Sequence, residues 1–186
     1  MKKYFVRFFY PIALIFLMAN FTGAYFSDNI SVSGNFSAAD SGSVEVVINE
    51  IMANPVGDDA AVMPGGEWVE LYNKGTWAIN VNGWYLYDSI NSHDLLISVS
   101  NVGGGSTVIP VGGYLVVYRN SDGSFELNNT TTDEVRLFDG PIGSSTLIDN
   151  FSYAIGTIFE GQSWVRVPNG SATWLQNQSP TKGFAN

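Results

Sequence analysis

Acidic side chains form the densest group of residues in this chain that could do chemistry. The group consists of Asp58, Asp59, Glu67 and Glu70. Calcium binds about six to eight oxygen ligands, several of them carboxylates. These four residues are therefore candidate calcium ligands, although their spacing matches no EF-hand loop, and no other cofactor is expected. The alternative is that Asp58 and Asp59 solvate a loop while Glu67 and Glu70 lie on the outer face of a strand.

Catalytic roles for these carboxylates form the second hypothesis. Two carboxylates that face each other across a sugar can hydrolyse a glycosidic bond, so a small metal-dependent hydrolase is the alternative to a non-catalytic module. The rest of the chain offers no catalytic set. Its one histidine, His93, lies in a polar loop between Ser92 and Asp94, and sequence neighbours cannot form a catalytic triad. Gly103–Gly105 lacks the Lys-Ser/Thr sequel of a phosphate-binding loop. We predict a protein that is not an enzyme and has no catalytic residues.

Tryptophan side chains are the third candidate, because exposed aromatic rings stack on sugars and anchor protein contacts. We assign Trp84 and Trp164 to the core, since burial of such rings would stabilise a domain that has no cysteine and hence no disulfide. Trp68 and Trp174 are the two expected to be exposed. If they line up with Tyr72, the three form a patch for a sugar or a protein.

These side chains must be positioned by strands. Short β-branched and aromatic runs are bounded by Gly, Asn, Asp or Pro, and none shows sustained helical periodicity. The expected strands are Val44–Met52, Glu67–Asn73, Trp77–Val81, Gly83–Asp88, Leu95–Val99, Tyr114–Arg119, Glu134–Phe138, Leu147–Tyr153 and Ser163–Val167. Their spacing predicts an all-β domain over residues 44–186, a sandwich or barrel.

Alternation along the second of these strands predicts how its side chains are shared between two faces. Val69 and Leu71 should face the core, and Trp68, Glu70 and Tyr72 should lie on a face that is at least partly wet. In the first strand, Glu50 lies among apolar residues and would need a partner if buried. Arg166 or Lys74 could supply that partner.

Basic residues followed by an apolar run open the chain. Lys2, Lys3 and Arg7 precede the run Phe8–Ala19, and small residues follow it, which is typical of an export signal. Residues 1–24 are expected to be a cleaved signal peptide, with a retained membrane anchor as the alternative and the only expected contact with a membrane. Residues 25–43 are rich in Ser, Asn, Gly and Asp and are expected to be a flexible linker. We therefore expect a secreted protein at the cell surface.

Seven Asn-x-Ser/Thr triplets fall in the expected exported part, where the motif permits glycosylation. They begin at Asn29, Asn35, Asn128, Asn129, Asn150, Asn169 and Asn177. A chain this rich in Asn, Ser and Thr would also produce several by chance.

A specific pattern runs through the predicted domain. It begins with Val-Ile-Asn-Glu-Ile-Met-Ala-Asn-Pro at residues 47–55 and Gly-Glu-Trp-Val-Glu-Leu-Tyr-Asn at residues 66–73. It continues at residues 83–88, 109–117, 135–137, 147–149, 161–166 and 179–183. Over nearly all of residues 44–186 this pattern resembles the lamin tail domain in its exported prokaryotic form. The resemblance implies an immunoglobulin-like β-sandwich and implies no reaction.

The segments Ala24–Asp28 and Ser33–Phe36 resemble the start of mature camelysin-type surface proteins of prokaryotes. The coiled-coil rod that precedes the lamin tail domain in nuclear lamins is missing, so a filament or chromatin role is not expected.

The net charge of the chain distinguishes between the possible classes of partner, which are nucleic acid, surface protein and glycan. The chain has 8 basic and 17 acidic residues and a formal net charge of −9, and removal of the signal segment would lower it to about −12, which repels nucleic acid. We therefore predict a non-catalytic exported binding or structural module that mediates cell-surface association or assembly. Its expected partner is a surface protein or a glycan. Nucleic-acid binding, by analogy with other lamin tails, is the second alternative.

Overall fold

The computed structural model describes residues 44–154 and 158–186. The expected signal or anchor segment 1–24 and the expected linker 25–43 lie outside the described residues, as do Asn29 and Asn35. No helix among the described residues has the length and apolar character needed to cross a membrane.

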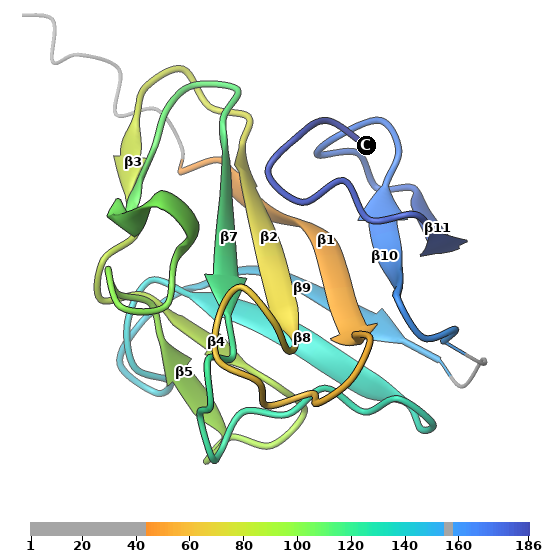
Figure 1. Ribbon diagram of the computed structural model, residues 1–186. Helices are drawn as coiled ribbons and strands as arrows, with labels where there is room; N and C mark the ends of the chain where they lie inside the picture. The colour runs from red at the N-terminus through yellow and green to blue at the C-terminus, as the bar shows by residue number, and fades with distance from the viewer. Residues whose placement is uncertain (1–43, 155–157) are drawn as a thin grey trace, which may run out of the picture. The chain divides into compact units, whose positions relative to one another are not determined.

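Two antiparallel sheets make up most of the described chain (Figure 1). The five-stranded sheet has the order β11-β10-β1-β2-β7 and the four-stranded sheet has the order β5-β4-β8-β9. The first contains β1 (Val46–Asn54), β2 (Trp68–Asn73), β7 (Tyr114–Tyr118), β10 (Gln162–Arg166) and β11 (Trp174–Gln178). The second contains β4 (Tyr85–Tyr87), β5 (Asp94–Leu96), β8 (Asp133–Phe138) and β9 (Leu147–Tyr153).

A small third sheet and one short turn complete the secondary structure of the described residues. β3 (Ile79–Asn80) pairs with β6 (Val108–Ile109), and η1 (Gly103–Gly105) is a single 3-10 turn next to β7. Pro110 follows β6 directly, as expected of a residue that cannot donate to a sheet ladder.

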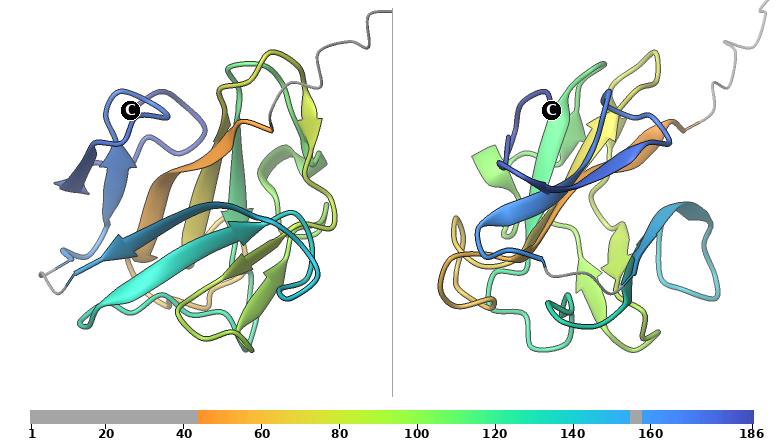
Figure 2. Two further views of the ribbon diagram at one scale, coloured as in Figure 1. Left: turned by 180° about the vertical axis from the view of Figure 1, so that it is seen from behind. Right: turned by 90° about the vertical axis from the view of Figure 1, so that its right-hand side faces the viewer.

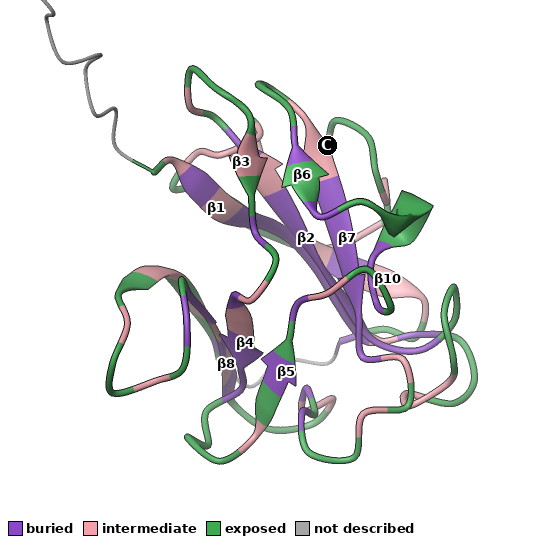
Figure 3. Cartoon of the chain, turned by 90° about the vertical axis from the view of Figure 1, so that its left-hand side faces the viewer, coloured by how far each residue is buried: buried purple, intermediate pink, exposed green. Residues whose placement is uncertain are grey.

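The hydrophobic core lies between the two large sheets, which cross face to face (Figure 2). Val69 and Leu71 of β2 point into it and are fully buried, as the alternation predicts. Leu86 and Leu137 come from the opposite sheet. Figure 3 shows mainly buried residues along β2 and β7, whereas β6 and many loops are exposed. This arrangement confirms the predicted immunoglobulin-like β-sandwich.

A β-bulge in β1 sets the orientation of its side chains. Ile48 pairs with Leu71 and Glu50 pairs with Glu70, so Asn49 is the extra residue. A bulge changes the phase of the alternation by one residue. Ile48 and Ile51 therefore both belong to the core, whereas Glu50 lies on the outer face of the five-stranded sheet beside Glu70.

Two strands were not predicted, β6 and β11. The β11 sequence Trp-Leu-Gln-Asn-Gln has neither the alternation nor the β-branched residues that identify a strand. The outer face of β2 is drier than expected: Trp68 is 2% exposed, Glu70 is fully buried, and Tyr72 alone of the three is half-buried. The reason is a segment, residues 179–186, that lies over this face.

Candidate binding face of the five-stranded sheet

The outer face of β1 and β2 carries two adjacent buried carboxylates. Glu50 and Glu70 are paired across the two strands and both are fully buried. Asn49, the bulge residue, donates from Nδ2 to Glu70 Oε1 at 3.0 Å. Ser163 of β10 donates from Oγ to Glu50 Oε1 at 2.6 Å. The four residues form a polar centre shared by β1, β2 and β10.

Residues 179–186, here called the strap, supply the remaining donors to this polar centre. Thr181 donates to Glu50 through its backbone nitrogen, 3.1 Å from Oε1, and through Oγ1, 2.9 Å from Oε2. Gly183 donates its backbone N–H to Glu70 Oε2 at 2.6 Å. Asn186 donates from Nδ2 to the backbone oxygens of Asn49 and Arg166. Buried carboxylates need such donors, so strap and sheet depend on each other.

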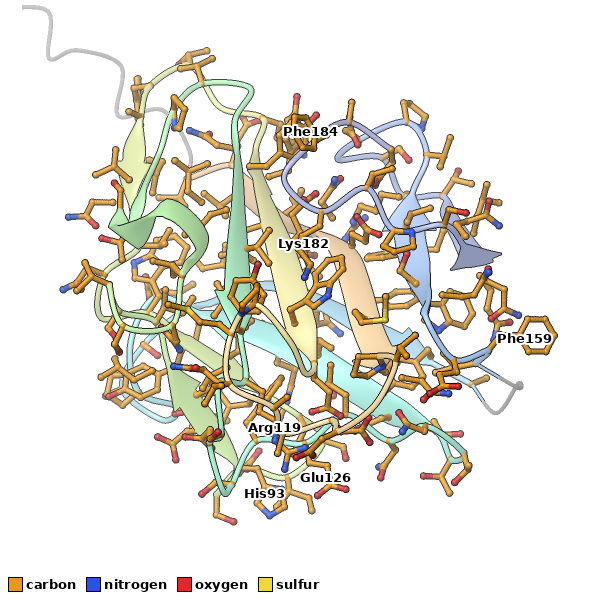
Figure 4. All side chains as sticks on the ribbon, in the orientation of Figure 1. His93, Arg119, Glu126, Phe159, Lys182 and Phe184 are labelled. Atoms are coloured by element: carbon orange, nitrogen blue, oxygen red, sulfur yellow. The ribbon has the colours of Figure 1, made fainter. Side chains whose placement is uncertain are left out.

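Lys182 of the strap occupies an aromatic cage. Its Nζ lies 5.0 Å from the ring centroid of Trp68 and 4.9 Å from that of Tyr118, within cation–π range. Nζ also donates to the backbone oxygen of Pro64 at 3.1 Å. Trp68 and Tyr118 pack with Met52 and Val116 in a second, smaller hydrophobic cluster. Figure 4 shows Lys182 over the sheet and Phe184 further along the strap.

Burial dominates the titration of these groups. Desolvation raises the pKa of Glu70 to about 7, against the lowering effect of the donors Asn49 and Gly183. It also raises the pKa of Glu50, against Ser163, Thr181 and the charge of Lys182. Desolvation lowers the pKa of Lys182, and Glu50 opposes that shift. Burial therefore outweighs the hydrogen-bond donors at both carboxylates, and the ionised forms of Glu50 and Glu70 are disfavoured on this face.

A cavity of about 310 Å³ opens next to Lys182. Met52, Trp68, Pro64, Pro180 and the 79% exposed Val56 are among its lining residues. Lys182 is the one charged residue in this lining. The cavity therefore suits an apolar group and offers no carboxylate.

The four candidate calcium ligands are divided between separate places. Asp58 Oδ1 accepts the backbone N–H of Ala60, and Asp59 Oδ2 accepts from Asn129 Nδ2. Glu70 belongs to the polar centre under the strap, and Glu67 lies at one end of the core. The described residues hold no group of three or more His, Asp or Glu side chains suited to a metal ion. Glu70 lies on the outer face of β2, as the alternative reading expected, but it is fully buried there, and Glu67, which precedes β2, is fully buried as well.

Glu67 forms a buried ion pair instead. Arg119 donates from Nη1 to Glu67 Oε2 at 3.0 Å, and the backbone N–H of Leu127 donates to Oε1 at 3.1 Å. Desolvation raises the pKa of Glu67 to about 8, although Arg119 and Leu127 lower it. The pair ties β2 to the loops that follow β7. Figure 4 shows Arg119, Glu126 and His93 at one end of the domain.

Neither cation expected as a partner of Glu50, Arg166 or Lys74, forms an ion pair with it in the described part of the chain. Arg166 pairs with Asp149, Nη2 to Oδ2 at 2.8 Å, and donates from Nε to the backbone oxygen of Ile48. Glu50 relies on the hydroxyls of Ser163 and Thr181 and on the backbone N–H of Thr181. The bulge at Asn49 causes this difference, because it turns Glu50 toward the outer face.

The proposed aromatic patch does not form as a unit. Trp68 and Tyr72 share the outer face of β2, whereas Trp174 of β11 packs against the main core. The Trp174 ring stacks on Phe151 with centroids 3.8 Å apart, and Arg166 lies 4.7 Å from its centroid. Trp84 is buried in the core as predicted, and Trp164 is partly buried against it. Trp68 is the aromatic residue of the patch that lines the cavity.

His93 takes a structural role. Its Nδ1 lies 2.8 Å from Asp88 Oδ2, and Asp88 also accepts backbone N–H groups from Ile90 and Glu126. These contacts hold the loops at the end of the four-stranded sheet.

The glycosylation triplets differ in accessibility. Asn150 is exposed on β9, where its Nδ2 donates to Glu134. Both polar atoms of the Asn169 side chain are hydrogen-bonded: Nδ2 donates to the Tyr114 hydroxyl and Oδ1 accepts from Asn49. Asn128, Asn129 and Asn177 are half-buried. Of the described candidates, Asn150 is the one whose side chain is exposed, and its hydrogen bond to Glu134 lies at the surface.

A family model described as the Lamin Tail Domain matches residues 39–154. The match covers β1 to β9 and ends before β10, β11 and the strap. No curated protein and no solved structure matches the chain.

Proposed function

Because the chain belongs to the lamin tail domain family of immunoglobulin-like modules, we propose that it is an exported, non-catalytic module that mediates cell-surface association or assembly. Its partner is a surface protein or a glycan.

The hydrogen bonds that the buried carboxylates accept are the main support for a non-catalytic module. The buried carboxylates of the described chain, Glu50, Glu67, Glu70, Asp88 and Asp133, each accept hydrogen bonds that hold strands and loops together. A general acid, a general base or a metal ligand must present its oxygen atoms to a reacting group. Since these oxygen atoms are occupied by structural donors, the arrangement supports binding rather than catalysis.

The cavity beside Lys182 supports a binding role for the outer face. It is lined by exposed apolar residues and by Trp68, and such patches on a soluble domain mark interaction sites. The net charge of −9 disfavours a nucleic-acid partner.

Export is tested by fractionating cells and determining the mature N-terminus and mass of the native protein. We expect the protein at the surface or in the medium, without residues 1–24. A variant with Lys2, Lys3 and Arg7 replaced by Glu should stay inside the cell, because the signal would lose its basic region. Native protein found inside the cell with Met1 intact would contradict the proposal.

Binding is tested with glycan arrays and pull-downs from surface extracts, using the intact protein. Val56→Asp places a charge in the cavity lining and should reduce binding at least several-fold. Val111→Asp is the matched control, since Val111 is 56% exposed and lies outside that lining. Equal loss in both variants, or turnover of a polysaccharide, would count against a non-catalytic module acting through this face.

A further inference from the structure

Another cavity, of about 370 Å³, lies between two loops that follow edge strands of different sheets. Residues 97–101 follow β5, at the edge of the four-stranded sheet, and residues 119–122 follow β7, at the edge of the five-stranded sheet. We call it the edge cavity, and residues of the segments 95–101 and 119–122 line it. Seven of its nine lining residues are polar or charged, so its chemistry differs from that of the cavity beside Lys182.

Hydrogen bonds between the two loops fix the shape of the edge cavity. Tyr118 donates its backbone N–H to the backbone oxygen of Asn101 at 2.8 Å, and Asn120 donates from Nδ2 to that of Ser100 at 3.1 Å. Asn101 is 6% exposed, and its side-chain amide closes the first loop through two hydrogen bonds to the backbone, each 3.0 Å long. The cavity is therefore a fixed feature of the fold.

The second loop adopts a left-handed turn that proteins usually build with glycine. The backbone N–H of Asp122 donates to the backbone oxygen of Arg119 at 2.9 Å, and φ is 50° at Asn120 and 64° at Ser121. Positive φ at both central residues marks a type I′ turn, whose second central residue is most often glycine. Side chains kept in such strained backbone regions gather at binding sites. Here the turn places Arg119 beside Asp122, with Nε donating to the backbone oxygen of Asp122 at 3.1 Å.

Polar groups of the edge cavity keep hydrogen-bonding capacity for a ligand. Asp122 Oδ1 accepts two backbone N–H groups, at 2.8 and 2.9 Å, whereas Oδ2 accepts no hydrogen bond from the described residues. Arg119 donates from Nε and Nη1 within the fold, but its Nη2 lies 3.9 Å from the Glu126 carboxylate, beyond hydrogen-bond distance. The hydroxyl oxygens of Ser98 and Ser100 lie 2.7 Å apart, and each can take part in a further hydrogen bond. The cavity therefore offers an acceptor, a donor and two hydroxyl groups.

This combination of groups fits a neutral sugar. The lining contains one basic and one acidic side chain, Arg119 and Asp122, so it has no formal net charge and no preference for an ion. A sugar ring presents hydroxyl groups that donate and accept, together with apolar C–H faces. Leu96 is 46% exposed and supplies an apolar wall for such a face. Glycosidic hydrolysis requires two carboxylates and the lining holds one, so the cavity suits binding without cleavage.

We propose that the edge cavity binds one neutral sugar unit of a surface glycan, with sugar hydroxyls on Arg119 Nη2 and Asp122 Oδ2 and a C–H face on Leu96. This inference rests on the proposed binding function and names the ligand class and the site for its glycan partner. The cavity volume is that of a site for a small ligand. A glycan repeats its units, so copies of the domain crowded on a surface would bind it with added avidity.

Saturation-transfer NMR on the intact protein tests the site. The neutral probes are glucose, galactose, mannose and N-acetylglucosamine, and glucuronic acid is the charged probe. We expect transfer to at least one neutral sugar, and Leu96→Ser should weaken its binding about tenfold because the apolar wall is lost. Leu147→Ser is the matched control, since Leu147 is also 46% exposed and lies outside the lining. Equal binding by the two variants, or transfer to glucuronic acid alone, would overturn the proposal.

Asp122→Asn is a second variant, which keeps an oxygen for the N–H groups of the turn and replaces Oδ2 by an amide donor. It should also weaken binding of the neutral sugar about tenfold. The host must not glycosylate Asn-x-Ser/Thr, because the change creates such a triplet. Asp139→Asn is the matched control: Asp139 is exposed, its Oδ1 accepts the backbone N–H of Thr146 at 2.7 Å, and it lies outside the lining. Circular dichroism checks that all variants are folded.

Failure of this inference is distinguishable from failure of the proposed function. The export assay and the pull-downs with Val56→Asp do not involve residues of the edge cavity. Absence of transfer to every neutral sugar would overturn the inference, and the proposed function would then depend on a surface protein as partner. Transfer that persists undiminished in both Leu96→Ser and Asp122→Asn would place the sugar elsewhere on the domain and would also overturn it.

Discussion

Buried acidic residues in this domain are stabilised in two different ways. Glu67 faces Arg119 at 3.0 Å, an ion pair with little exposure on either side. Glu70 has no such cation and relies on the amide of Asn49 and the N–H of Gly183. An ion pair in the interior costs desolvation of both partners, and loss of one partner leaves an uncompensated charge. The two sites should therefore respond differently to substitution.

Arg119→Ala should lower the free energy of unfolding by about 1–3 kcal/mol, because the buried Oε2 of Glu67 would lose its donor. Urea unfolding followed by tryptophan fluorescence measures the change. Glu126→Gln is the control: Glu126 lies 3.9 Å from Arg119, but its side chain is 62% exposed, and surface pairs contribute about 1 kcal/mol or less. Similar losses in the two variants would show that burial does not set the strength of this pair.

The site was only partly predictable from the residues. The sequence identified Glu50 as a residue in need of a partner, but alternation alone could not place the bulge at Asn49 that turns Glu50 outward. The strap was also hidden, because Thr181 reaches Glu50 across 131 positions of the chain. Sequence periodicity reflects neighbours two to four residues apart. A contact between residues that are more than a hundred positions apart therefore leaves no periodic signal.

At the scale of elements, β10 and β11 extend the five-stranded sheet beyond β1 and contact β9 through aromatic rings. Phe151 of β9 meets both Trp164 and Trp174. The strands of the main body were predicted from alternation, because a half-buried strand must alternate. β11 was missed because it lies at a sheet edge, where pairing with β10 and the stack of Trp174 on Phe151 hold the strand without an alternating apolar face.

Trp174→Ala should destabilise this attachment by about 1–3 kcal/mol, because it removes the stack on Phe151 and the contact with Arg166. Amide hydrogen exchange should accelerate in β10 and β11 more than in β4 or β8. Leu175→Ala is the matched control on the same strand, since Leu175 is 42% exposed. Uniform acceleration across both sheets would mean that the two strands do not open separately.

Glycan attachment should follow the accessibility of the triplets. In a host that glycosylates Asn-x-Ser/Thr, we expect occupancy at Asn150, which is exposed, and none at Asn169, which is half-buried with its amide bound to Tyr114. Peptide mass spectrometry of the secreted protein measures both positions. Asn150→Gln should remove that glycan without loss of fold. Occupancy at Asn169 would require the contacts of Asn49 and Tyr114 to open.

At the scale of the whole molecule, the carboxylates with raised pKa values couple folding to pH. A folded-state pKa above the unfolded value means that the folded protein binds more protons, so stability falls as pH rises. Stability falls over the pH interval between the ordinary pKa and the folded-state pKa of each group. This interval runs from 4.5 to about 7 for Glu70 and from 4.5 to about 8 for Glu67. Both contributions are fully present below about pH 4.5 and are lost as pH rises through those folded values.

We therefore expect the free energy of unfolding to decrease between pH 5 and pH 7, with a slope of up to about 1.4 kcal/mol per pH unit from each such group. Glu70→Gln removes one titrating group and should make the slope shallower by about that amount. Urea unfolding at pH 5, 6 and 7 measures the slope, and Glu126→Gln, at an exposed side chain, should leave it unchanged. If stability instead rose across this interval in the unchanged protein, Glu70 would have to be held as a carboxylate in the folded state. The donors Asn49 and Gly183 would then outweigh its burial.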